Sequence, residues 1–167
     1  MANALTVPHT VAALVLCVAG LAKLRRPAGA ARAVGLAPGP VRVFAVAELG
    51  LGAWALAAAA PVASLLMAGL YAGFAALTLR LARHGKTCGC FGAQGSPASP
   101  LQSLLSITLA GASALAAGGG THAAGWILGR PPGFMTLVVL GTAGAVYGIV
   151  LAYSELPLLW RSWSPAA

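Results

Sequence analysis

The sequence predicts an all-α integral membrane protein, a helical bundle with four to five transmembrane helices. Of its 167 residues, 59% are hydrophobic and 7% are charged, whereas a soluble domain carries about a quarter charged residues. Several apolar runs approach the roughly 20 residues that a helix needs to cross a hydrocarbon core. Basic residues gather at the ends of these runs, where they orient helices in the lipid bilayer.

Five apolar runs are the expected helices of a single domain over residues 1–167: 7–22, 41–60, 62–81, 101–117 and 134–153. The first and fourth are somewhat short, so we expect them to tilt little or to end in the interface. Glycine and alanine recur within the runs, as in GLGAWALAAAA, and such small residues let membrane helices pack closely. Buried helices of a soluble protein are a weaker alternative, because the chain lacks polar faces to cover such a core.

The first run is not expected to be a signal peptide. Its N-terminal flank, MANALTVPHT, contains no Lys or Arg, and the charges KLRR follow the run instead of preceding it. That order is the reverse of a secretory signal.

The distribution of basic residues predicts the orientation of the helices. Basic residues occupy the loops after the first and third runs: Lys23, Arg25, Arg26, Arg32, Arg42, Arg80, Arg83 and Lys86. The turn around Pro61 has none, and the fourth loop has Arg130. The positive-inside rule then places the N-terminus outside and the C-terminus in the cytoplasm. The net charge of +8 does not indicate nucleic-acid binding, because no soluble basic surface interleaved with aromatic residues is present.

Cys88-Gly89-Cys90 is the first candidate site, in the expected cytoplasmic loop. In a turn, with Gly89 free to adopt a positive φ, the two sulfurs can approach each other. A disulfide so formed is small and strained, which suits exchange better than structural support. The basic residues Arg83, His84 and Lys86 favour the thiolate, which is the attacking species. The alternative is a pair of small interfacial cysteines without a chemical role.

Cys17 and Glu48 are further candidates on the same side of the membrane. Cys17 lies six residues before Lys23 and Glu48 lies six residues after Arg42, so each is expected roughly 9 Å from the cytoplasmic end of its helix. An ionisable residue inside a membrane helix indicates a functional site. Glu48 could accept protons from thiol chemistry, or form a structural pair with Lys23 or Arg42. Cys17 could be a relay thiol or a packing residue.

The remaining polar and aromatic residues give weaker indications. His84 could join the thiols as a metal ligand, although a solvated loop residue is the commoner case. His9 and His122 fall on the opposite side and receive no role. No cofactor is identified, since no quinone or haem site can be read and paired histidines within the helices are missing. Interface anchors are expected at Trp126, Trp160 and Trp163.

The segments AGLAKLRRP, AVAELGLGAWAL and RHGKTCGCFG occur in this order, and the chain resembles the methylamine-utilisation MauE proteins of the DoxX-like group. The likeness spans roughly Val7 to Ala117, and CGCFG is its most specific part. The resemblance implies membrane thiol–disulfide chemistry with Cys88 and Cys90 as the redox pair. It also implies a role in the maturation of methylamine dehydrogenase, whose small subunit contains many disulfides.

The leading functional hypothesis is therefore a thiol–disulfide oxidoreductase, or its membrane subunit, which passes electrons between a thioredoxin-like protein and a disulfide-containing client. The alternative is a carrier of mercuric or cuprous ions with Cys17, Cys88 and Cys90 as ligands, because thiolates suit soft metals. A third hypothesis is a non-catalytic scaffold for a partner's redox domain. The implied client is extracytoplasmic, whereas Cys88 and Cys90 are expected on the cytoplasmic side. Three explanations remain open: electrons cross the membrane through the bundle, the orientation is inverted, or this protein serves a different client.

Overall fold

The computed structural model is all-helical and describes residues 2–89 and 97–155. Within those residues, five helices are long and apolar enough to cross a membrane: α1 (Ala2–Arg25), α3 (Pro38–Ala58), α4 (Pro61–Arg83), α5 (Pro100–Gly119) and α6 (Pro132–Ser154). Two shorter helices connect them, α2 (Pro27–Val34) and the 3-10 helix η1 (Ala124–Gly129). The expected fold class is confirmed, with five candidate spans over the described part of the chain.

The expectation that the first and fourth helices are short is wrong. α1 has 24 residues and α5 has 20, because α1 continues beyond its apolar run at both ends and α5 also includes Pro100, Gly118 and Gly119. At the start of α5, the amide of Ser99 donates to Gln102 Oε1 at 3.1 Å, a contact that stabilises the start of a helix. Helices α2 to α6 each begin at a proline, whose fixed φ suits the first helical position.

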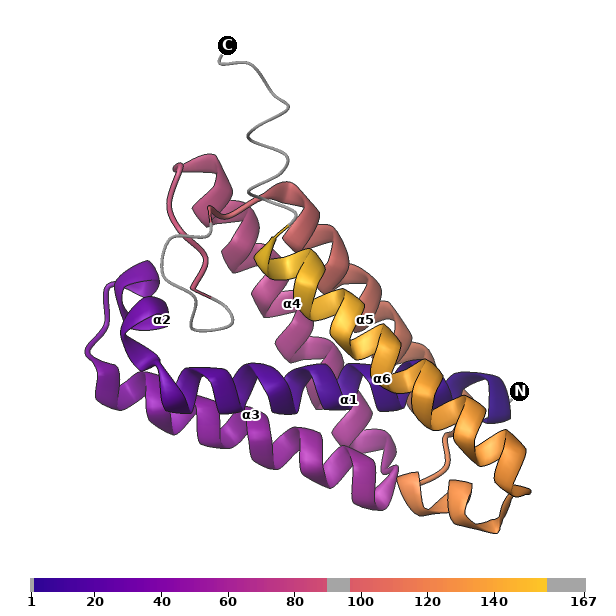
Figure 1. Cartoon of the computed structure of the whole chain (residues 1–167). Coiled ribbons are helices and arrows are strands. Elements are labelled where there is room, and N and C mark those ends of the chain that lie inside the picture. Colours follow the sequence, from indigo (N-terminus) through magenta and orange to yellow (C-terminus); the bar gives the residue numbers. More distant parts are fainter. Residues whose placement is uncertain (1, 90–96, 156–167) are drawn as a thin grey trace.

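The membrane helices form two antiparallel pairs that cross each other, α1 with α3 and α4 with α5 (Figure 1). α1 and α3 approach closely where Gly20 and Gly52 face the opposite backbone. A Cβ on Gly20 would lie 2.8 Å from the carbonyl oxygen of Ala45, and one on Gly52 would lie 2.8 Å from that of Ala13. Small residues at such contacts are typical of membrane helix pairs.

Side-chain hydrogen bonds connect the two pairs and α6. The Tyr71 hydroxyl of α4 donates to the carbonyl oxygen of Ala12 at 2.6 Å. Gln102 of α5 donates from Nε2 to the carbonyl oxygen of Tyr153 in α6 at 2.8 Å. Between the helices lies an apolar core that includes Leu16 and Met67, both fully buried. Since lipid chains are as apolar as this core, packing and hydrogen bonds hold such bundles together.

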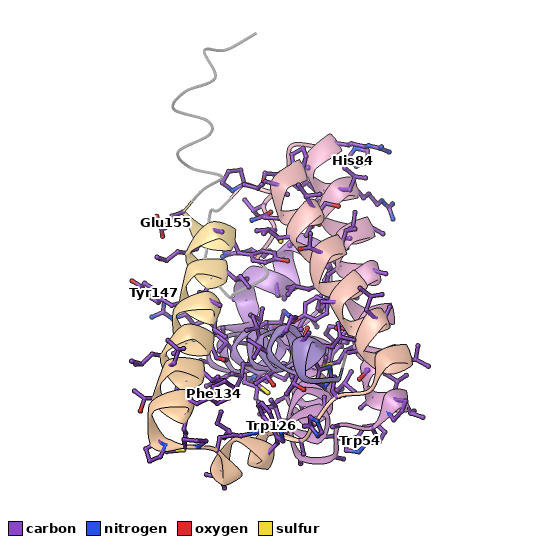
Figure 2. All side chains as sticks on the ribbon, turned by 90° about the vertical axis from the view of Figure 1, so that its right-hand side faces the viewer. Trp54, His84, Trp126, Phe134, Tyr147 and Glu155 are labelled. Carbon is purple, nitrogen blue, oxygen red and sulfur yellow. The ribbon has the colours of Figure 1, made fainter. Side chains whose placement is uncertain are left out.

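The outer surface of the bundle is apolar, as a lipid-facing surface must be. Val43 and Leu137 are 72% and 70% exposed, and Figure 2 shows Tyr147 directed outward from α6. The labelled Trp54 and Trp126 lie at the end opposite His84 (Figure 2). The chain is a multi-pass membrane protein. The anchoring role of Trp126 stays a prediction, and Trp160 and Trp163 lie outside the described residues.

Candidate functional site at the Cys88 end of the bundle

The loop after α4 folds back toward α2 and buries Cys88 (Figure 1). The amide of Lys86 donates to the carbonyl oxygen of Leu81 at 3.0 Å, and the Lys86 carbonyl accepts from Ala98 at 3.0 Å. An isolated antiparallel bridge joins Thr87 to Pro97. These backbone bonds hold the segment before Cys88 in place, and the Cys88 side chain is 5% exposed.

Gly89 fixes this loop against the first turn of α2. Its φ is +60°, a conformation that glycine adopts without steric cost. A Cβ there would lie 2.6 Å from the carbonyl oxygen of Gly29 and 2.8 Å from the amide nitrogen of Ala30. Both contacts are with backbone atoms, so a side chain at this position could be accommodated only if the loop moved away from α2.

The structure separates the described cysteines. Cys88 takes part in a disulfide bond, whereas Cys17 is a free thiol. The Cys17 sulfur lies between α1 and α3, 3.9 Å from the carbonyl oxygen of Leu49 and tightly against Gly52. Cys17 therefore faces α3 and not the loop of Cys88. Cys90 lies outside the described residues.

Glu48 forms a buried ion pair with Lys23. The Lys23 ammonium donates to Glu48 Oε1 at 2.5 Å, and the two residues are 6% and 1% exposed. The rings of Phe74 and Phe44 lie beside the ammonium, with centroids at 4.9 and 5.9 Å. Because α3 begins at Pro38 and not at residue 41, Glu48 lies about 15 Å along its helix instead of the expected roughly 9 Å.

Cys88 and Lys23 both line a cavity of about 560 Å³, here called the Cys88 cavity. Its wall is mostly apolar and takes residues from all five membrane helices, from α2 and from the loop after α4. Tyr71, Ser106 and Tyr153 add hydroxyl groups to it. Neither Cys17 nor Glu48 is among the described lining residues, but Glu48 reaches the cavity indirectly through Lys23.

The four predicted site residues thus differ in where the structure places them. Cys88 lies in the cavity wall, and Glu48 pairs with Lys23 of that wall. Cys17 packs against α3, and Cys90 lies outside the described residues. His84 is exposed at the end of α4. Sequence reasoning missed Tyr71, Ser106 and Tyr153, since hydroxyl residues in apolar runs give no signal of a shared cavity. The sequence analysis treated Lys23 mainly as a charge that orients the first helix. An ion pair between Lys23 and Glu48 was one of its alternatives.

The family model described as methylamine utilisation protein MauE matches residues 1–124. The chain belongs to the MauE family. The matched region contains Cys17, Glu48, Cys88 and the helices α1 to α5, whereas α6 follows it. The family's description links the chain to methylamine utilisation. No curated protein and no solved structure matches the chain significantly.

We expect Lys23→Met to destabilise the protein by about 3–5 kcal/mol, because it leaves the Glu48 carboxylate buried without its partner. The double variant Lys23→Met/Glu48→Gln should recover most of this loss, since neither remaining side chain is charged. Thermal unfolding in detergent measures both effects. Lys86→Met, which removes an exposed lysine of the same end, is the control and should unfold like the wild type. Equal stability of Lys23→Met and wild type would show that the ion pair is dispensable.

We expect Gly89→Ala to release the loop of Cys88 from α2. Gly85→Ala is the matched control, because Gly85 has a φ of +61° but nothing within 4 Å of its Cβ position. Both variants carry the cost of a left-handed alanine, roughly 1–2 kcal/mol, and Gly89→Ala alone meets the α2 backbone. After reduction, alkylation of Cys88 by a water-soluble maleimide should be faster in Gly89→Ala than in Gly85→Ala. Identical rates would contradict the contact with α2.

Proposed function

We propose that this MauE-family protein is a membrane thiol–disulfide redox protein in which Cys88 and Cys90 interconvert between a dithiol and a disulfide. The observation that carries this proposal is the disulfide-bonded state of Cys88 in the wall of a mostly apolar cavity. A small, strained disulfide beside a glycine suits thiol exchange. Gly89 also packs closely against the backbone of α2. This contact holds the loop of Cys88 in one position, which supports the proposal.

The soluble partner in this proposal is a thioredoxin-like protein, and the client is a protein with disulfides such as methylamine dehydrogenase. The family's link to methylamine utilisation supports this choice of client. Because Cys88 is 5% exposed, we expect the soluble partner to form its mixed disulfide with Cys90.

Glu48 and Cys17 receive different roles in the proposal. Forming a disulfide releases two protons, and Glu48 is proposed to accept protons through Lys23, which lines the cavity. Cys17 packs against Leu49 and Gly52, so it is proposed as a packing residue that takes no part in exchange. It therefore serves as the natural control for the two loop cysteines.

The orientation that fits the basic residues places the Cys88 end of the bundle at the cytoplasmic side. The ends of α1 and α4 carry Lys23, Arg25, Arg80 and Arg83, and α2 carries Arg32. Reporter fusions after Arg32 and after Lys86 should both be cytoplasmic. A periplasmic reporter at Lys86 would invert the orientation and place the cysteines on the side of an extracytoplasmic client.

Removal of the cysteine that resolves a mixed disulfide should trap the partner protein. We expect Cys88→Ser to accumulate a covalent adduct that reductant dissolves, and Cys90→Ser to accumulate less, because Cys88 is buried. Cys17→Ser should trap nothing and should leave the oxidised fraction of the loop unchanged. Non-reducing electrophoresis followed by mass spectrometry measures all three variants. If no variant traps a protein and the purified wild type carries a stoichiometric soft metal, the protein is a metal carrier instead.

A further inference from the structure

We propose that the Cys88 cavity binds a lipid-soluble quinone, which accepts the electrons of the Cys88–Cys90 dithiol. The inference rests on the proposed redox function and adds the oxidant that this function requires. The Cys88 cavity lies among the membrane helices. A redox site there can exchange electrons directly with a carrier dissolved in the lipid.

The cavity has the size and the access that such a carrier needs. Its volume of about 560 Å³ falls in the range of roughly 300–1,000 Å³ that is typical of small-molecule sites. Gly69 and Gly73 of α4 line it and are exposed. A Cβ at either glycine would meet nothing within 4 Å. We therefore assign the entry of an apolar molecule from the surrounding lipid to this glycine face.

The polar groups of the cavity favour a quinone over a lipid chain. The Lys23 ammonium has three N–H donors, and its hydrogen-bond partner among the described residues is Glu48. The remaining donors lie beside the rings of Phe44 and Phe74. A quinone carbonyl accepts such a hydrogen bond, and a buried positive charge stabilises the negative charge that the ring acquires during reduction. An acyl chain offers no acceptor, so a buried ammonium in the wall would be unfavourable for it.

The redox step balances with this carrier. The two thiols of Cys88 and Cys90 lose two electrons and two protons and form one sulfur–sulfur bond. The quinone gains two electrons and two protons and becomes a quinol. No other oxidant is required, and the position of Cys88 in the cavity wall brings one of the reacting sulfurs to the bound ring.

The test uses decylubiquinone as the probe and fills the cavity from its glycine face. The purified full-length protein is reduced, freed of reductant and mixed with decylubiquinone, and quinol formation is followed by ultraviolet absorbance. Gly73→Leu places a side chain in the cavity. The control Gly111→Leu adds the same side chain at an exposed position of α5 that also has nothing within 4 Å. Binding is measured separately as the rise in unfolding temperature that decylubiquinone causes.

We expect the wild type to form one quinol for each disulfide and Cys88→Ser to form none. Quinol formation should be slower by about fivefold or more in Gly73→Leu, since overpacking a site costs about 1–3 kcal/mol, which corresponds to roughly 5- to 150-fold. Gly111→Leu should react like the wild type. Oxidation by diamide, a small water-soluble reagent, should be equal in both glycine variants, which shows that their dithiols remain reactive.

Three outcomes would overturn the inference. If diamide oxidises the wild-type dithiol but decylubiquinone neither stabilises the protein nor is reduced, the quinone proposal fails and the proposed redox function stands. If Gly73→Leu forms quinol as fast as Gly111→Leu, the Cys88 cavity is not the quinone site. If neither reagent produces a disulfide at Cys88, the redox function fails, and the electron transfer to quinone fails with it.

Discussion

The buried ion pair between Lys23 and Glu48 is the constraint on which the geometry of the Cys88 end depends. It joins the last turn of α1 to the first half of α3, both inside the apolar bundle. A charge left alone at such depth is costly, so α1 cannot slide along α3 without losing its partner. The same contact holds the Lys23 ammonium at the cavity wall between two aromatic rings. One interaction therefore sets the register of two helices and places a positive charge in the wall of the cavity that Cys88 also lines.

The loop and the cavity are built on this fixed helix pair. α2 follows α1 directly, and Gly89 packs against its first turn so closely that only a glycine fits. Cys88 is thereby placed in a wall to which α4, α5 and α6 also contribute. The proposed redox chemistry would need no large movement of the helices, since the exposed Gly69 and Gly73 and the loop of Cys88 line the same cavity. The site unites the disulfide-bonded Cys88, a buried cation and an apolar space.

The sequence predicted the helices well and the site only in part. Long apolar runs define the spans locally, which is why the fold class and five helices could be foreseen. The lengths of α1 and α5 could not, because both helices continue past their apolar runs, and the end of a helix depends on capping and tertiary contacts that hydropathy does not reveal. The partner of Glu48 was among the alternatives, because only a few basic residues could reach it. The facing direction of Cys17 and the cavity depend on helix rotation and crossing, which long-range packing determines and short patterns do not reveal.

A redox titration of the purified protein tests the central claim most directly. The protein is equilibrated in glutathione buffers of increasing reducing strength, its thiols are alkylated under denaturing conditions, and each cysteine is quantified by peptide mass spectrometry. The account predicts that Cys88 and Cys90 change from unmodified to alkylated together in one two-electron transition, while Cys17 is alkylated at every ratio. Absence of any transition at Cys88, or loss of Cys17 alkylation under oxidising conditions in step with Cys88, would contradict it.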